Sequence, residues 1–295
     1  MKTETVIDTV ALQCNFYDEE KCNIAQYEII ERLKGYILHI GDKEHKLYSD
    51  DDITFEYKYK PIATIYTGSF SYVTKDKKKA NKVWYLSIKL AGLKRYIAER
   101  DKVSQNVLML IVSYLNTHKI SFKITQFDVA LNIFTKYENT LALCTNRYST
   151  AKYWKANEKQ PFDTTTYMEK FKSKKHKADA VLHVCHYYKS AKEELEYNLT
   201  RVEFSFQKKF FKNNGFNVGE MYKEFYRYHV MYIPNQKTKQ EIMDKYDSLE
   251  VMRLKDIKDL KIERYRLHVD MNVLVDFTTK LYLVNDDVLD SFMLN

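Results

Sequence analysis

Three segments of this chain alternate apolar and polar residues, and this period of two constrains the fold more than any other feature of the sequence. The segments are 125–134 (TQFDVALNIF), 181–188 (VLHVCHYY) and 199–206 (LTRVEFSF). Successive side chains of a β-strand point to opposite faces of a sheet. Each segment therefore predicts a strand with one apolar face, which can pack on a core, and one polar face.

The polar positions of these predicted strands carry side chains that can do chemistry. They are Asp128 and Asn132 in the first segment, His183, Cys185 and Tyr187 in the second, and Arg201 and Glu203 in the third. A sheet with one apolar and one polar face is typical of an antiparallel sheet that helices cover on one side. The sequence thus predicts an α+β fold in which one face of the sheet is covered by helices and the other is available for an active site.

Further elements are indicated on both sides of these segments. Residues 53–72 and 82–90 are rich in β-branched and aromatic residues, which predicts strands. Residues 104–118 carry apolar residues at helical spacing, and Ser104 is placed to cap that helix. From about residue 211 the pattern turns helical, after a predicted loop around residues 213–215. We expect a catalytic domain over residues 1–212 and a mainly helical C-terminal subdomain over residues 213–295.

Charge favours a nucleic-acid partner. The net charge is +8 and the pI is near 8.9, and a basic protein attracts polyanions because bound phosphates release their counterions. Lysines gather in two clusters, which we interpret either as DNA-backbone contacts or as solvated loops. The candidates for DNA contact are Lys77, Lys78, Lys79, Lys172, Lys174 and Lys175.

Cysteine spacing and apolar run length bear on the cellular compartment. The four cysteines show no Cys-x-x-Cys spacing, which disfavours a zinc knuckle or a disulfide framework and fits a reducing compartment. The longest apolar run is too short to span a bilayer, and the N-terminus shows no signal-peptide pattern. We therefore expect a soluble protein of the cytoplasm.

Two carboxylates on one sheet face suit a hard divalent cation. Asp128 and Glu203 would offer oxygen ligands to Mg²⁺ or Mn²⁺, and the metal could polarise a phosphodiester. A tyrosine beside the metal could attack phosphorus and form a covalent phosphotyrosine. Because the pKa of free tyrosine is about 10, this group needs the metal, a cation such as Lys189 or a base such as His183 nearby. Arg201 could bind a phosphate oxygen through two hydrogen bonds.

Purely structural roles would explain the same residues. A salt bridge between Asp128 and Arg201 would account for both without catalysis. Most of the 25 tyrosines can reflect the composition of an AT-rich genome and need no chemical role. Glu193 stands three residues after Ser190, which is the spacing of a capping box, so it can be a helix cap instead of a metal ligand.

Three short stretches, taken together and in order, carry a family resemblance. They are 124–132 (ITQFDVALN), 187–193 (YYKSAKE) and 199–205 (LTRVEFS). They resemble the motifs TRxDLAxD, Y-[ND]-K-x-x-E and WRVEIEL of the trans-acting plasmid rolling-circle replication initiators, the nicking–closing Rep proteins. Related relaxases and phage replication initiation factors share this pattern. The chain departs from it at Gln126, Asn132 and Ser205, where the family has an arginine and two acidic residues.

The resemblance implies roles for individual residues over roughly residues 55–210. Asp128 and Glu203 match acidic residues of the family, and Glu193 is a further candidate ligand for Mg²⁺ or Mn²⁺. Lys189 follows Tyr187 by two residues, which makes Tyr187 the nucleophile, whereas the spacing to Glu193 would select Tyr188. We favour Tyr187, because its position in the strand places it on the same face as His183. Arg201 and Lys189 complete the expected catalytic set.

The resemblance also implies properties of the whole protein. It implies a five-stranded antiparallel sheet with helices, and a 5′-phosphotyrosine intermediate that leaves a 3′-OH primer. It implies recognition of a replication origin at a single-stranded or hairpin nick site in a bacterial cell, with recruitment of a host helicase. A homodimer is a further expectation, and the C-terminal helices could read the origin or form dimer contacts.

Two other functions remain open on the sequence. A relaxase would use the same chemistry at a transfer origin. A non-catalytic DNA-binding regulator derived from an initiator would explain the three departures from the motifs. A tyrosine recombinase is disfavoured, because its Arg…His-x-x-Arg…Tyr order is absent and the tyrosine precedes Arg201.

Overall fold

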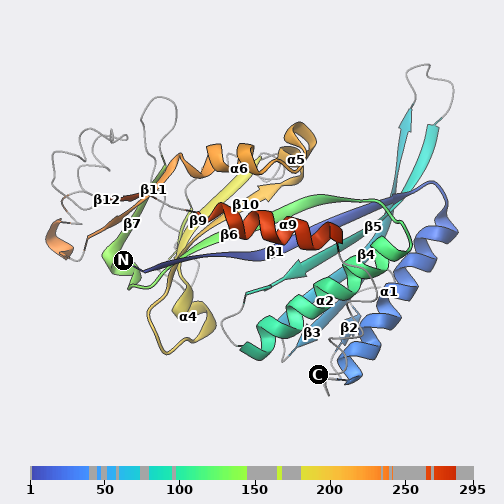
Figure 1. Ribbon diagram of the computed structural model, residues 1–295, viewed down its shortest axis with the longest axis horizontal. Coiled ribbons are helices and arrows are strands. Elements are labelled where there is room, and N and C mark those ends of the chain that lie inside the picture. The colour runs from blue at the N-terminus through green and yellow to red at the C-terminus, as the bar shows by residue number, and fades with distance from the viewer. Residues whose placement is uncertain are drawn as a thin grey trace. The chain divides into compact units, whose positions relative to one another are not determined.

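The computed structural model describes residues 2–39, 45–47, 52–57, 60–73, 80–94, 98–144, 165–167, 181–233, 235–238, 241, 264–266 and 269–283 (Figure 1). Contacts within the chain divide it into two compact units. Unit 1 comprises Met1–Ile7 and Asp128–Val275, and unit 2 comprises Asp8–Phe127 and Asp276–Asn295. This division does not coincide with the predicted boundary between residues 212 and 213, because β1 (Thr3–Phe16) and β6 (Phe122–Ile133) each contribute residues to both units.

Unit 2 contains an antiparallel sheet built from β-branched and aromatic residues, which suit a pleated, half-buried surface. Its strands are β2 (His45–Leu47), β3 (Asp52–Tyr57), β4 (Lys60–Val73) and β5 (Ala80–Ala91), followed by the later part of β1. Ile65 lies opposite Ile88 and Ala63 lies opposite Leu90, and all four side chains are buried. These cross-strand pairs form the apolar face of the sheet.

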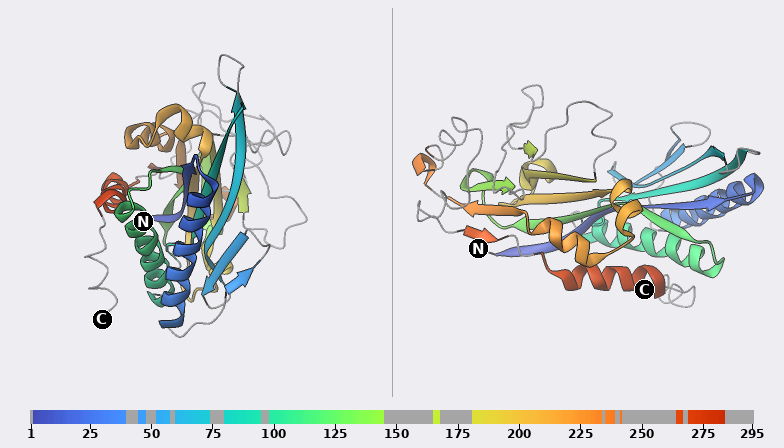
Figure 2. Two further views of the ribbon diagram at one scale, coloured as in Figure 1. Left: turned by 90° about the vertical axis from the view of Figure 1, so that its right-hand side faces the viewer. Right: turned by 90° about the horizontal axis from the view of Figure 1, so that it is seen from above.

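Two helices cover this apolar face. Helix α1 (Glu19–His39) and helix α2 (Ala98–Thr117) lie side by side on the same side of β4 and β5 (Figure 2). The Tyr114 hydroxyl of α2 donates a hydrogen bond of 2.7 Å to the Glu28 carboxylate of α1. The predicted start of α2 was wrong: the helix begins at Ala98, and Ser104 is buried inside it instead of capping it.

Unit 1 holds the three strands whose alternation the sequence showed. The first residues of β1 lie next to the later part of β6, and the order continues through β10 (Thr200–Gln207), β9 (Leu182–Tyr188) and β8 (Thr165–Tyr167). A second sheet in this unit has the order β12–β11–β7. Its strands are β7 (Thr140–Cys144), which follows the 3₁₀ helix η1 (Tyr137–Asn139), β11 (Tyr228–Tyr232) and β12 (Arg264–Arg266).

Aromatic residues form the core of unit 1. The apolar face of β10 meets α5 (Lys208–Asn214) and α6 (Val218–Phe225), which lie beside it in Figure 1. The ring of Phe225 lies 4.9 Å from that of Phe204 and 5.5 Å from that of Phe206, edge to face in both cases. Edge-to-face packing is a preferred arrangement of buried aromatic rings. Helix α4 (Lys189–Glu193) follows β9, and helix α9 (Met271–Leu283) runs from unit 1 into unit 2.

The fold is α+β, as the sequence predicts, but two expectations need correction. The expected number of five strands was wrong, because the described residues form a sheet with nine strands. The C-terminal part is less helical than expected, because β11 and β12 both lie after residue 213. Within the C-terminal part expected to be mainly helical, most of residues 248–268 lie outside the described residues, and the described ones, Arg264–Arg266, form a strand.

Within the part of the chain that the structure describes, every helix is too short or too polar to cross a bilayer.

The aromatic core predicts that alanine substitutions at two adjacent residues of unit 1 change the free energy of unfolding by very different amounts. Phe225→Ala removes a fully buried ring from contact with Phe204 and Phe206, and should lower the free energy of unfolding by about 3–5 kcal/mol. Tyr226→Ala is the control, because that side chain is half exposed and should cost less than about 1 kcal/mol. Urea unfolding measures both, and equal midpoints for the two variants would contradict this core.

Candidate active site

The candidate site lies on the polar face of β6, β9 and β10, within unit 1. Arg201 lies opposite Tyr187, Glu203 opposite Cys185, and Ser205 opposite His183. The alternate positions pair Phe204 with Val184 and Phe206 with Leu182, and these side chains are buried in the core. The alternation in the sequence thus correctly separated the polar from the apolar face of these two strands.

Tyr187 makes a direct hydrogen bond to the candidate acidic site. Its hydroxyl donates to Glu203 Oε2 at 2.8 Å. The Tyr187 side chain is only 6% exposed, so its ring is covered, while its hydroxyl is directed to a carboxylate and not into apolar packing. Tyr188 lies elsewhere, because its hydroxyl donates to the side-chain oxygen of Asn198. Of the two candidate nucleophiles, the structure brings Tyr187 to an acidic partner.

Arg201 is completely buried and holds this carboxylate in place. Its Nε donates to Asn132 Oδ1 at 3.0 Å, and its Nη1 lies 3.5 Å from Glu203 Oε2. A buried guanidinium needs such partners, since removing a charge from water costs several kcal/mol. With no exposed surface, Arg201 does not meet a phosphate in this structure. It acts instead as a positioning residue for Glu203.

Asn132 explains one departure from the Rep motif. Its Oδ1 accepts from Arg201, and its Nδ2 donates to Glu4 Oε2 of β1 at 3.0 Å. An aspartate at this position could accept from Arg201 but could not donate to Glu4. The Asn132 side chain therefore links β1, β6 and β10. It belongs to a continuous network of hydrogen bonds and one ion pair that connects, in order, Glu4, Asn132, Arg201, Glu203 and Tyr187.

Ser205 explains a second departure. Its hydroxyl donates to Asp128 Oδ1, and Gln207 Nε2 donates to the Ser205 oxygen at 2.7 Å. Asp128 is 5% exposed, so this hydrogen bond fixes the orientation of a buried carboxylate. Ser205 stands two residues after Glu203 on the same strand face, so Asp128 lies against the face of β10 that also carries Glu203.

The donor set fits a divalent metal in part. A magnesium ion that also binds substrate phosphate commonly uses one or two carboxylates and completes its shell with water. Asp128 and Glu203 supply two carboxylates on one sheet face. Among the described residues, however, no three His, Cys, Asp or Glu side chains are arranged to hold a metal. Glu193 is therefore not gathered with the other two, and its Oε1 pairs with Lys189 Nζ at 3.1 Å.

The structure identifies a cation that the sequence did not single out. Lys189 is 3% exposed and is occupied by its ion pair with Glu193. Lys192 is exposed, and its Nζ lies 5.1 Å from the centre of the Tyr187 ring, against 6.0 Å for Lys189. Lys192 stands three residues after Lys189 in α4, and residues at this spacing share a helix face, which was the available signal.

The remaining candidates have other environments. Burial raises the pKa of the Cys185 thiol well above its usual range, and the Glu203 carboxylate raises it further. Cys185 therefore stays a thiol at neutral pH, which disfavours a nucleophilic role. His186 Nε2 lies 2.9 Å from Thr140 Oγ1, and its ring stacks on Tyr137. The six candidate DNA-contact lysines, Lys77, Lys78, Lys79, Lys172, Lys174 and Lys175, all lie outside the described residues.

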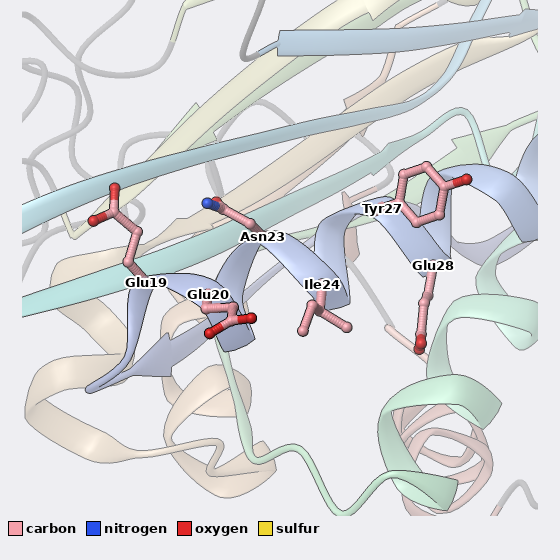
Figure 3. A pocket seen from close by; sticks show the side chains of 6 residues that line it. All are labelled: Glu19, Glu20, Asn23, Ile24, Tyr27 and Glu28. Carbon is pink, nitrogen blue, oxygen red and sulfur yellow. The ribbon is translucent and has the colours of Figure 1, made fainter.

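A pocket elsewhere in the chain holds none of the predicted site residues. Figure 3 shows six lining side chains that all come from α1 of unit 2: Glu19, Glu20, Asn23, Ile24, Tyr27 and Glu28. Three of them are carboxylates, so this pocket suits a cationic group better than a phosphate. It does not bear on the chemistry of the polar face in unit 1.

Comparison with known proteins adds little to this geometry. No protein-family model matches the chain, and no curated protein matches it in sequence. One similar solved structure is the rolling circle replication initiator protein from Geobacillus stearothermophilus. The similarity covers 80% of this chain and 91% of that one, at 12% sequence identity and a TM-score of 0.33. A similarity this weak carries no argument about function. The functional proposal below therefore rests on the sequence motifs and on the geometry of the site.

The position of Asn132 generates a prediction about stability. Asn132→Ala leaves the buried Arg201 Nε without its acceptor, which should lower the free energy of unfolding by about 1–3 kcal/mol. Asn15→Ala removes an amide from an exposed position of β1 and serves as the control, with an expected change below about 0.5 kcal/mol. Chemical unfolding monitored by circular dichroism compares them, and a neutral Asn132→Ala would remove Asn132 from the proposed network.

Proposed function

We propose that this chain nicks and rejoins one strand of DNA through a phosphotyrosine at Tyr187, as a rolling-circle replication initiator does. The observation that carries the proposal is the hydrogen bond from the Tyr187 hydroxyl to Glu203, whose carboxylate is paired with the buried Arg201. The three sequence motifs support it, because Asp128, Tyr187 and Glu203, which they select, lie on one sheet face. Recruitment of a host helicase and formation of a homodimer stay predictions from the resemblance.

The proposed reaction proceeds in two displacements at phosphorus. The Tyr187 oxygen attacks the scissile phosphate, a bond from phosphorus to that oxygen forms, and the bond from phosphorus to the 3′ oxygen breaks. The phenolic proton passes to Glu203, and the departing 3′ oxygen takes up a proton to become a 3′-OH. In the reverse step a 3′-OH attacks the phosphotyrosine, the strand is rejoined and Tyr187 is released. Covalent catalysis of this kind splits one difficult strand transfer into two easier steps.

Each neighbouring residue has a defined part in this proposal. Glu203 accepts the proton, and Arg201 orients that carboxylate through their ion pair. The exposed Lys192 is placed to offset the negative charge of phenolate and phosphate beside the Tyr187 ring. Asp128 and Glu203 would hold Mg²⁺ or Mn²⁺, which when bound would polarise the phosphodiester. Ser205 would keep Asp128 in position for that ion.

One observation favours a second function. Tyr187 is 6% exposed and Arg201 is fully buried, so the hydroxyl meets a phosphodiester only after the groups around the ring move. A non-catalytic DNA-binding regulator derived from an initiator would need no such movement. A relaxase would share the chemistry and differ only in the DNA site that it cuts. Formation of a covalent adduct separates both enzymes from the regulator.

The nucleophile is tested by conservative replacement of each tyrosine. Tyr187→Phe removes the attacking oxygen and should abolish the covalent protein–DNA adduct. Tyr188→Phe is the matched control, because its hydroxyl binds Asn198 and not the acidic site, and it should keep nicking within about threefold of wild type. The assay uses Mn²⁺ with supercoiled and single-stranded DNA that contains the origin. Loss of the adduct in Tyr188→Phe alone would transfer the role to Tyr188.

The acidic residues are tested separately from DNA binding. Asp128→Ala and Glu203→Ala should each lower the nicking rate by about a hundredfold or more, because a general base or metal ligand contributes on this scale. Glu196→Ala, at an exposed position after α4, is the control and should nick like wild type. DNA binding measured by gel shift should change little in all three. Unchanged nicking in either site variant would remove that residue from the mechanism.

A further inference from the structure

Strands β4 and β5 extend beyond their neighbours in unit 2 as a two-stranded ribbon. β3 pairs with β4 only as far as Tyr66, and β1 pairs with β5 only as far as Trp84. In the described strands, residues 70–73 of β4 and 80–83 of β5 therefore pair only with each other (Figure 1). An isolated two-stranded ribbon adds little stability by itself, so the residues that it presents call for another explanation.

One face of β4 and β5 is aromatic where the two strands leave the sheet and continue as this ribbon. The strand register places four aromatic side chains on the same face, which we term the aromatic face: Tyr66, Phe70 and Tyr72 of β4, and Tyr85 of β5. The Tyr85 ring lies 6.3 Å from the ring of Tyr66 and 6.3 Å from that of Phe70. The four rings thus follow one another along the ribbon instead of being scattered over it.

Gly68 makes this arrangement possible. A Cβ atom at Gly68 would lie 2.5 Å from Tyr85 Oη and 2.6 Å from Tyr85 Cζ, so a side chain at this position would displace the Tyr85 ring. The Tyr85 ring therefore lies across the glycine and flat along the ribbon. This packing holds Tyr85 between Tyr66 and Phe70 and creates a continuous aromatic surface.

The aromatic face is the face that the helices leave uncovered. The alternate residues Ile65, Leu86 and Ile88 are buried on the side where α1 and α2 pack (Figure 2). Farther along the ribbon both faces are open: Phe70 is 44% and Tyr72 is 42% exposed on the aromatic face, and Val73 is 61% exposed on the other, so the aromatic rings are what distinguishes the aromatic face. Exposed aromatic residues gathered in one place are a recognised mark of a binding surface.

The charges near the aromatic face favour an anionic partner. Lys89 shares this face through its register with Thr64 and is exposed. In the sequence, residues 74–79 between β4 and β5 read TKDKKK, with four lysines and one aspartate, and they lie outside the described residues. Aromatic rings on an open sheet face, together with lysines, are the combination by which proteins stack the bases and bind the phosphates of single strands.

We propose that the aromatic face binds single-stranded DNA, with bases stacked on Phe70, Tyr72 and Tyr85. Duplex DNA keeps its bases stacked on one another, so only a single strand offers free base faces to these rings. This inference rests on the proposed function in one respect, namely that the bound nucleic acid is DNA. It adds to that function a second DNA-binding surface, distinct from the polar face that carries Tyr187.

The test measures binding of a fluorescent 16-nucleotide single strand to the full chain by anisotropy. The double variant Phe70→Ala/Tyr72→Ala should weaken binding by about tenfold or more, because each stacked ring contributes about five- to a hundredfold. Phe70→Tyr/Tyr72→Phe keeps both rings and should bind like wild type. Tyr17→Ala/Tyr27→Ala removes two rings that lie outside the ribbon and are more exposed than Phe70 and Tyr72, and it is the control.

The outcomes separate this inference from its alternatives. Equal binding by wild type and the double alanine variant overturns the inference. So does an equal loss on a duplex of the same length, which would indicate lost charge or fold instead of lost stacking. A dimer that becomes a monomer in sedimentation, with single-strand binding unchanged, would make the aromatic face a self-association surface. If the double alanine variant loses single-strand binding and the wild-type protein forms no covalent adduct, the result would support this inference and reject the proposed nicking.

Discussion

The complete burial of Arg201 is the constraint on which the rest of the site depends. A guanidinium charge inside unit 1 must be surrounded by acceptors, since an unpaired buried charge is strongly destabilising. Asn132 and Glu203 supply them from neighbouring strands, and Glu4 extends the network to β1. The pairing of β1, β6 and β10 and the orientation of Glu203 are thus fixed by one residue. Tyr187 joins the same network through its hydroxyl, so the candidate nucleophile is oriented by the groups that stabilise the fold.

This arrangement gives the departures from the Rep motif a physical meaning. An acidic residue in place of Asn132 would compete with Glu203 for the charge of Arg201 and would repel Glu4. An acidic residue in place of Ser205 would lie against Asp128, whereas the hydroxyl donates a hydrogen bond to it. Both replacements lower the number of negative charges around Asp128 and Glu203. They are consistent with a working site of fewer carboxylates, and they leave Glu203 as the group in direct contact with the tyrosine.

Much of unit 1 could be predicted from the sequence, because its strands have one apolar and one polar face. The period of two placed Asp128, Tyr187 and Glu203 each on the polar face of its strand, and the neighbouring positions of β6, β10 and β9 bring them to one side of the sheet. It did not reveal that Arg201 would be inaccessible, since burial depends on which strands become neighbours. Lys192 was missed because its spacing from Lys189 in α4 does not by itself show that this helix face lies against the Tyr187 ring. The sequence predicted only a strand and a turn in the region of the ribbon. Its aromatic face could not be predicted, because Gly68 and Tyr85 come into contact only through the pairing register of β4 and β5.

The central claim is that Tyr187 becomes covalently attached to DNA, and peptide mapping of the adduct tests it most directly. The protein would be incubated with Mn²⁺ and a single-stranded oligonucleotide carrying its nick site, then digested with nuclease and trypsin. The tryptic peptide 178–189 (ADAVLHVCHYYK) contains both candidate tyrosines, and fragmentation in the mass spectrometer distinguishes them. The account predicts a nucleotide phosphate on Tyr187. A modification on Tyr188, or a peptide that stays unmodified while the DNA is cut, would contradict it.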